Sequence, residues 1–332
     1  MSAEPRYSAL VTGATGFIGG HLVQRLLKEG WKLRLLVRNS AALPASLAAQ
    51  VELHPGDLRD RESLQAVAAG VDVVFHCAAN VHTWDRRENY EATNVAGLAN
   101  LLAAIREQGN LPRVVHLSSV DVYGFPKKPC TEDCPTPITG FGYGDSKIAG
   151  EGIIRDAIAG WGLPAVILRP SNVMGVGSPF IDRIGAELRN GLMLRIQGGE
   201  IDCGFLPIDD LLAVMLWSAR AVQAVGETFN VNGGLGISWR GFLTDLRRGI
   251  RGKGIVLDLP FPVADLAARA IAAPYKVLGL AREPLLHPLL VRIFGRTCGH
   301  EIDKLRRFGA PAPGQEYERV MAAAIAAFLA KE

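Results

Sequence analysis

The chain has 332 residues, of which 48% are hydrophobic and 21% charged, so it can bury a substantial core. This composition excludes a largely disordered chain, and the 37 glycines show no collagen-like period. The formal net charge of +3 is too close to balance to suggest a nucleic-acid partner, so a small molecule is the expected ligand.

The termini and cysteines indicate a cytoplasmic protein without a metal site. The polar first seven residues and the short apolar run after them do not resemble a signal peptide. No apolar run reaches the ~18 residues that a bilayer span needs, and the nearest case, 256–280, is broken by charges and prolines. The cysteines are odd in number and scattered, and we expect free thiols in a reducing compartment: Cys77, Cys130, Cys134, Cys203 and Cys298.

Short apolar runs rich in branched side chains alternate with longer helical patterns, which is typical of a parallel sheet with helices on both faces. The expected strands are Ser8–Thr12, Lys32–Val37, Val51–His54, Asp72–His76, Arg113–Leu117 and Ala165–Leu168. The expected helices are Gly16–Glu29, Asp60–Ala69 with Asp60 as its N-cap, Arg87–Glu107 and Gly144–Gly160.

The regular alternation ends near Pro170. Beyond it, 206–220 and 227–232 are expected to return to the sheet, and the rest to form a cap. We therefore predict an α/β fold with a Rossmann-type doubly wound parallel sheet and a smaller mixed α/β C-terminal substrate cap. The dinucleotide-binding domain would span 1–172 plus about 205–232, and the substrate-binding cap about 173–204 and 233–332.

Three glycines, Gly13, Gly16 and Gly19, lie between the first expected strand and the first expected helix. Glycine permits the tight turn and the close backbone approach that a dinucleotide needs there, and the helix N-terminus attracts its pyrophosphate. The spacing alone is weak, but its position predicts a dinucleotide-binding loop.

Arg38 directly follows the second expected strand, where dinucleotide folds usually place the residue that meets the adenosine ribose. A guanidinium pairs well with a 2′-phosphate, whereas an acid would bind the free 2′-hydroxyl. Arg38 therefore favours NADP(H), with NAD(H) as the alternative cofactor, unless it is a solvated surface arginine.

Two Tyr-x-x-x-Lys pairs occur, Tyr123/Lys127 and Tyr143/Lys147. The chemistry needs both side chains one helical turn apart, and Pro126 makes a helix unlikely at the first pair. Tyr143 and Lys147 therefore form the candidate catalytic pair, in which the lysine would lower the tyrosine pKa from its usual value near ~10. Ser118 and Ser119 follow the fifth strand, at the carboxyl edge where such sheets bind ligands, and either hydroxyl could bind the reacting oxygen.

This combination resembles the extended short-chain dehydrogenase/reductase superfamily over nearly the whole chain. The motifs that carry the resemblance are Thr12-Gly-Ala-Thr-Gly-Phe-Ile-Gly19, Gly56-Asp-Leu58, His76-Cys-Ala-Ala79, Asn94-Val-Ala-Gly97, Ser118-Ser-Val-Asp-Val-Tyr-Gly124, Tyr143-x-x-x-Lys147 and Arg169-Pro-Ser-Asn-Val173.

The resemblance implies roles for individual residues. Ser119, rather than Ser118, matches the catalytic serine, Tyr143 the general acid/base, and Lys147 the residue that also binds the nicotinamide ribose. The implied cofactor-binding residues, with Arg38 from the argument above, are Gly13, Thr15, Gly16, Phe17, Ile18, Gly19, Arg38, Asp57, Leu58, Cys77, Ala78, Ala79, Asn94, Tyr143, Lys147, Pro170 and Val173.

The superfamily includes oxidoreductases, epimerases and dehydratases, so the fold does not settle the reaction. The resemblance implies an Asp-Glu pair after the serine in sugar-nucleotide dehydratases, and here those positions are Val120 and Asp121. The missing first acid argues against dehydration. The alternatives that stay open are a nucleotide-sugar epimerase with tightly bound NAD and a non-catalytic NADP(H)-binding sensor.

In the expected cap, apolar residues at 263, 266, 267, 270 and 271 fall on one helix face, and a second apolar stretch covers 284–294. Both resemble the C-terminal region of 3β-hydroxysteroid dehydrogenase-like and dihydroflavonol reductase-like members. The region could be a lid over an apolar substrate, a peripheral membrane contact or plain packing. The expected activity is interconversion of a secondary alcohol and a ketone on an apolar, sterol-like substrate. The family resemblance also implies a homodimer formed through helices 87–107 and 144–160.

Overall fold

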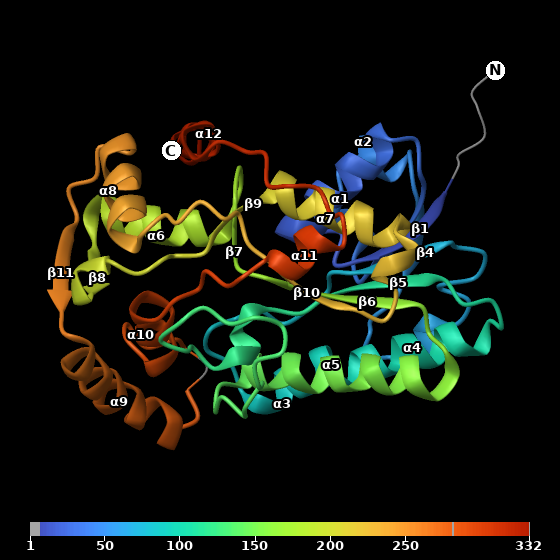
Figure 1. Cartoon of the computed structure of the whole chain (residues 1–332), viewed down its shortest axis with the longest axis horizontal. Coiled ribbons are helices and arrows are strands. Elements are labelled where there is room, and N and C mark those ends of the chain that lie inside the picture. Colours follow the sequence, from blue (N-terminus) through green and yellow to red (C-terminus); the bar gives the residue numbers. More distant parts are fainter. Residues whose placement is uncertain (1–6, 281, 332) are drawn as a thin grey trace.

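A seven-stranded parallel sheet lies at the centre of this computed structural model, which describes residues 7–280 and 282–331 (Figure 1). Its strands are β1 (Ser8–Thr12), β2 (Lys32–Val37), β3 (Glu52–Pro55), β4 (Val73–His76), β5 (Arg113–Leu117), β6 (Ala165–Pro170) and β10 (Thr228–Val231). They lie in the order β10-β6-β5-β4-β1-β2-β3, and every pairing is parallel. This is the predicted Rossmann-type order, continued by one strand at the β6 edge.

Helices cover both faces of the sheet (Figure 1). On one face α1 (Phe17–Lys28) and α7 (Ile208–Arg220) pack into a shared core with β1 and β6. On the other, α4 (Gly97–Glu107) and α5 (Gly142–Trp161) pack into a second core. Shorter elements are α2 (Ala45–Ala48), α3 (Arg87–Tyr90) with the π-helical segment Glu91–Ala96 that joins it to α4, and α11 (Asp303–Arg307).

The helix predicted over 60–69 is wrong. Only a 3₁₀ turn, Glu62–Leu64, forms there, and Ala66 adopts a positive φ of 55°. Arg34 on β2 explains the difference, because its guanidinium donates hydrogen bonds to the carbonyl oxygens of Ala66, Val67 and Ala69 at 3.3, 3.0 and 2.8 Å. Carbonyl groups turned toward Arg34 do not form a helical ladder.

Successive strands run from β1 toward β3 on one side and from β4 toward β6 on the other, so the sheet order reverses between β1 and β4. In open parallel sheets ligands bind at this reversal, outside the carboxyl ends of the strands. The loops after Thr12 and His76, the last residues of β1 and β4, therefore form the expected crevice.

The C-terminal part forms a cap with its own hydrophobic core, to which Phe125 from the N-terminal part is added. Its elements are β8 (Leu192–Ile196), paired with β11 (Ile255–Leu259), and the helices α6 (Pro179–Asn190), α8 (Trp239–Gly249), α9 (Phe261–Val277), α10 (Pro288–Gly295) and α12 (Tyr317–Leu329). Among the described residues no helix is both long and apolar enough to cross a membrane.

The two segments predicted to return to the sheet behave differently. The 227–232 segment does return, as β10. The 206–220 segment instead supplies the end of β9 (Phe205–Pro207) and α7. Strand β9 pairs with β7 (Asn172–Met174) in a separate two-stranded sheet, and α7 packs on the central sheet without joining it.

Helix α9 forms where the apolar pattern predicts it, but four of the five positions of its predicted apolar face point outward, and only Ala267 is partly buried against the cap core. Val263, Leu266 and Ile271 are exposed, whereas Ala264, Ala268 and Ala272 are buried against the protein. Alanine permits close approach between packed elements, so the small side chains determine which side of α9 packs.

Candidate active site

The glycine loop after β1 is tightly packed. Gly13 has φ +71°, and a Cβ placed there would lie 2.7 Å from the backbone nitrogen of Ala78, so only glycine fits. The Gly16 N–H donates to the Gly13 carbonyl at 2.9 Å, and α1 begins immediately afterwards. Because Gly16 is the N-cap and has no side chain, it leaves the first amide groups of α1 available for an anion. The loop fits a dinucleotide pyrophosphate; Thr15 and Gly16 are exposed, and Phe17 and Ile18 are partly exposed.

The second wall of the crevice is the segment Cys77–Asn80 after β4, which is partly exposed. Asn94 in the π-helical segment fixes it: its Oδ1 accepts from the Asn80 N–H at 2.7 Å, and its Nδ2 donates to the Asn80 carbonyl at 3.0 Å. The same Nδ2 donates to Ser146 Oγ at 2.9 Å. These bonds occupy the buried Asn94 amide, so Asn94 joins this wall to α5.

The residues expected to bind the adenosine half of the cofactor differ in exposure and in the contacts they make. Arg38 is exposed directly after β2, and no hydrogen bond or ion pair engages it in 7–280 or 282–331. The Asp57 carboxylate is held by Arg59 at 2.6 Å, which lowers the Asp57 pKa. Leu58 is buried beneath α4, where a Cβ at Gly97 would come within 2.9 Å of the leucine Cβ. Farther along, Pro170 at the end of β6 is buried and Val173 in β7 is partly exposed.

Ser119, Tyr143 and Lys147 come together at the carboxyl end of β5. Ser119 caps a 3₁₀ turn, Val120–Tyr123, and its hydroxyl lies near enough to Tyr143 to lower the pKa of the phenol, against the larger effect of burial. Tyr143 lies in the first turn of α5, and Lys147 follows one turn later with its Nζ 5.8 Å from the Tyr143 ring centre. The Lys147 Nζ also donates to the Leu117 carbonyl at 2.7 Å, which ties α5 to β5.

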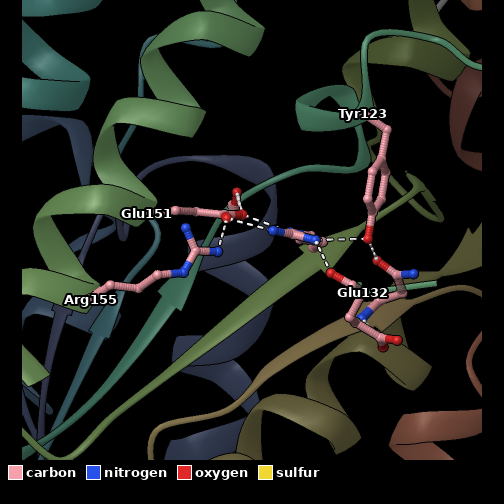
Figure 2. A network of polar contacts seen from close by, with 7 residues as sticks. Tyr123, Glu132, Glu151 and Arg155 are labelled. Atoms are coloured by element: carbon pink, nitrogen blue, oxygen red, sulfur yellow. Dashed lines mark hydrogen bonds and ion pairs between the residues drawn. The ribbon is translucent and has the colours of Figure 1, made fainter. Parts of the chain in front are cut away.

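A buried polar network lies behind this trio (Figure 2). The Ser118 hydroxyl donates to Glu151 Oε1 at 2.6 Å, so Ser118 faces away from Tyr143 and Ser119 is the hydroxyl left at the site. Arg169 binds both oxygens of Glu151 and donates to the Tyr123 hydroxyl at 2.8 Å. Tyr123 in turn donates to Asn230 Oδ1 at 2.7 Å. The network anchors both ends of the 118–123 loop.

The same contacts show which of the two tyrosine–lysine pairs can form the site. Tyr123 is buried in the network and lies in the 3₁₀ turn, whereas Lys127 is exposed. The prediction that Pro126 excludes a helix there is therefore confirmed, and only Tyr143 and Lys147 share a helix.

Burial determines the ionisation of the trio. It lowers the pKa of Lys147 to about 8, although the negative charges of Glu151 and Asp121 oppose the shift. Burial and the Asp121 charge raise the pKa of Tyr143 above its usual value. The expected lowering of the Tyr143 pKa by Lys147 is therefore not seen in the protein by itself, in which burial and the Asp121 charge raise that pKa.

Asp121 is a site residue to which the sequence argument gave no role. Burial raises its pKa to about 6, while a hydrogen bond with Ser119 and the charge of Lys147 lower it. The backbone N–H of Asp121 also donates to Ser119 Oγ at 3.2 Å. Its place two residues after Ser119 was the signal in the sequence, but only the folded turn brings its carboxylate to the trio.

A cavity of about 300 Å³ opens beside Tyr143. Its charged lining comprises Asp85, Arg86, Arg87, Asp145 and Lys276. Its apolar and aromatic lining includes Trp84, Phe141, Tyr275, Leu280 and Leu289. Sequence reasoning did not single out Trp84 or Phe141. Both lie in loops at the carboxyl edge of the sheet, Trp84 after β4 and Phe141 before α5, which is where ligand-binding residues collect in this fold.

Comparison with known proteins agrees with this geometry. Residues 9–232 match the model of the NAD dependent epimerase/dehydratase family. The chain belongs to this family. A family member from Stigmatella aurantiaca, 4-hydroxy-2-methyl-3-oxo-4-farnesyl-3,4-dihydroquinoline-1-oxide ketoreductase, is 30% identical over 302 residues, 90% of this chain and 89% of the relative.

Two further relatives mark the breadth of the family. Sterol demethylase protein B from Methylococcus capsulatus is 33% identical over 236 residues, which are 68% of this chain and 70% of the relative. The structure of Thermus thermophilus UDP-glucose 4-epimerase in complex with NAD has a TM-score of 0.73 at 21% identity, covering 97% of this chain and 99% of the other. This structural likeness establishes the shared fold. The description of the matched family names both epimerases and dehydratases, and the Stigmatella relative is a ketoreductase, so different reactions occur among the proteins that this chain resembles.

Proposed function

We propose that this protein is an NADP(H)-preferring oxidoreductase that interconverts a secondary alcohol and a ketone on an apolar, sterol-like substrate. The observation that carries the proposal is the Ser119–Tyr143–Lys147 arrangement at the carboxyl end of β5, beside a cavity with an aromatic and aliphatic lining. Such a site offers a proton donor, a hydrogen-bond partner for the reacting oxygen and an adjacent ammonium group.

The cofactor would lie across the crevice between β1 and β4. The first amide groups of α1 would hold its pyrophosphate, Cys77 to Ala79 would line its other side, and Arg38 would pair with the 2′-phosphate of NADP. Lys147 would bind the nicotinamide ribose. When bound, the reduced cofactor supplies the hydride that the carbonyl carbon accepts.

The side chains of this protein handle the oxygen and the proton. Ser119 donates a hydrogen bond to the carbonyl oxygen and fixes its position beside Tyr143. Tyr143 then donates its phenolic proton to that oxygen, which completes the alcohol, and the nearby Lys147 ammonium stabilises the resulting phenolate. Alcohol oxidation uses the same groups in reverse, with Tyr143 accepting the proton.

The cavity lining supports the choice of an apolar substrate. Trp84, Phe141 and Tyr275 offer aromatic surfaces, and Leu280 and Leu289 add aliphatic ones. The names of the Stigmatella ketoreductase and the Methylococcus sterol demethylase protein point in the same direction, since a farnesyl chain and a sterol are both large and apolar. Enzymes with such pockets obtain much of their substrate affinity from burial of apolar surface.

The test combines nucleotide analysis with a turnover assay. The purified protein is denatured and any released nucleotide identified by mass spectrometry; the protein freed of nucleotide is then titrated with NADPH and NADH. Loss of NADPH absorbance with a panel of sterol and long-chain ketones is the expected result. Stoichiometric NAD retained through purification, with no net turnover, would overturn the proposal and favour an epimerase. Nucleotide binding without turnover on the whole panel would favour a sensor.

A further inference from the structure

Helix α9 carries its large apolar side chains on the side that faces away from the protein. We define its outer face as Val263, Leu266, Ala270, Ile271, Pro274, Val277 and Leu278, all of which are exposed. These positions fall within one arc of the helix and its last turn, because successive residues rotate by about 100°. Leu266 is 71% exposed, Leu278 69% and Val277 85%. An exposed apolar stripe of this length marks an interaction surface.

The opposite side of α9 accounts for its attachment to the cap. Ala264, Ala268 and Ala272 are buried, and α10 packs beside α9 (Figure 1). Figure 1 also shows α9 at the margin of the cap, far from the central sheet. The helix therefore packs through alanines, and within the described part of the chain nothing covers its outer face.

The segment that carries this face has an excess of positive charge. Residues 261–296 contain five lysines and arginines against two acids. Both acids, Asp265 and Glu283, are engaged in ion pairs with arginine. Lys276 and Arg282 are exposed, and no interaction engages them within 7–280 or 282–331. Two cations near the C-terminal end of the stripe therefore have no ion-pair partner among the described residues, and one of them, Lys276, lies on the cavity side of α9.

We infer that the outer face of α9 binds the surface of an anionic lipid bilayer. A helix of this kind lies in the interfacial plane with its apolar side chains among the acyl chains and its cations at the headgroups. A second copy of the chain fits the face less well. In a two-fold dimer the same patch of both copies would come together, which would gather the unpaired cations of both copies near one contact without acids to pair with them.

The outer face of α9 lies next to the cavity, so membrane binding through this face would bring the cavity close to an apolar substrate. This step rests on the proposed function. Tyr275, Lys276, Gly279 and Leu280 line the cavity next to Tyr143, while Val277 and Leu278 between them belong to the outer face or its end. Docking would bring the cavity to the membrane surface. An apolar ketone or alcohol dissolved in the bilayer would then reach Tyr143 without crossing water.

The test is co-sedimentation of the full-length protein with unilamellar vesicles of phosphatidylcholine, with and without 30% phosphatidylglycerol. The wild type is expected to sediment with the anionic vesicles. The double variant Leu266→Asp/Val277→Asp is expected to bind at least about tenfold more weakly, because it places two carboxylates in the contact. Neither side chain lines the cavity. The matched control is Val222→Asp, at an exposed valine in another part of the fold (79% exposed), and it should bind as the wild type does.

Three results would overturn the inference. The wild type stays in the supernatant with both kinds of vesicle; the double variant binds vesicles as well as the wild type does; or the wild type binds no lipid but forms a dimer that the double substitution dissociates.

Equal melting temperatures check that the variants fold. Reduction of a water-soluble ketone in vesicle-free buffer separates this inference from the proposed function: the double variant should retain it. A protein that binds vesicles but reduces no ketone would refute the proposed function and leave the docking intact.

Discussion

Arg169 binds both carboxylate oxygens of Glu151, with its Nε 2.8 Å from Oε1 and its Nη2 2.7 Å from Oε2. Both side chains are almost completely buried, and they join β6 to α5 directly behind the loop that carries Ser119. Burial opposes ionisation of Glu151, but the hydrogen bonds and charge of Arg169 outweigh it and lower the pKa of the carboxyl. This pair therefore fixes the loop that carries Ser119 and also joins α5 to the central sheet.

Removing Arg169 should be costly. Arg169→Met leaves the buried Glu151 carboxylate with only the Ser118 hydroxyl and the half-exposed Arg155 as partners, and we expect a loss of about 3–5 kcal/mol in the free energy of unfolding. Arg155→Met is the matched control, because Arg155 binds the same carboxylate from a half-exposed position and should cost under about 1 kcal/mol. Chemical denaturation measures both. Equal losses would show that the buried position of Arg169 is unimportant.

The Glu151 pKa also predicts acid sensitivity. Because the folded pKa is below the unfolded value near 4.5, the pair contributes stability above pH 4.5 that is lost as the pH falls below it. Denaturation curves between pH 3 and 7 should show this loss in the wild type. A Glu151→Gln variant, which has no carboxyl to titrate, should show a smaller dependence over the same range.

Tyr143→Phe should remove the proton donor and retain the cavity. We expect kcat for ketone reduction to fall by about 10²- to 10⁴-fold, with the dissociation constant of NADPH almost unchanged. Tyr123→Phe is the control from the other tyrosine–lysine pair: it should lower stability through the lost bonds to Arg169 and Asn230 but keep most turnover. Normal turnover by the Tyr143 variant would exclude the proposed role.

The pKa of Lys147 predicts an alkaline limit to activity. Burial lowers that pKa to about 8, so the ammonium loses its proton as the pH rises through 8 and no longer stabilises a Tyr143 phenolate. Rates of reduction should therefore decline above about pH 8. Lys147→Arg keeps the positive charge at higher pH and should move the decline upward, provided that titration shows bound cofactor. An identical alkaline limb in both proteins would assign it to another group.

Titration of Asp121 should produce a second limb in the pH dependence of the reduction rate, on the acidic side. Burial raises its pKa to about 6, and above that pH its negative charge makes Tyr143 a weaker proton donor. Reduction should then become faster as the pH falls through 6, whereas Asp121→Asn should show a flat profile between pH 5 and 7. Single-turnover rates are the appropriate measurement, because product release does not limit them. A wild-type profile without this limb would contradict the prediction.

Arg38 should determine the choice of nucleotide. Arg38→Ala is expected to weaken NADPH binding by about 10- to 100-fold, the effect of one charge-assisted hydrogen bond, and to leave NADH binding unchanged. Arg61→Ala, which removes an exposed arginine paired with Glu107, is the control and should alter neither affinity. Fluorescence titration gives both constants. Parallel weakening of both nucleotides by Arg38→Ala would refute recognition of the 2′-phosphate.

The sequence alone determined the nucleotide-binding frame. β1, β2 and β5 begin and end at the predicted residues, because strands buried on both faces form continuous apolar runs with clear ends. The positive φ at Gly13 and the placement of Tyr143 and Lys147 in one helix also follow from local rules about glycine, proline and helical spacing. These features depend on residues close together in the sequence, so the sequence is enough to predict them.

Tertiary contacts decided the remaining features. Arg34 on β2 binds carbonyl groups of the 60–69 segment, so the expected helix does not form there. Helix α9 packs through Ala264, Ala268 and Ala272, so its larger side chains face outward. The environment of Tyr143, including the raised pKa of Asp121, likewise depends on residues brought together from separate segments. Periodicity shows that a segment has an apolar face, but the partner that covers that face, and the burial that shifts a pKa, exist only after the chain has folded.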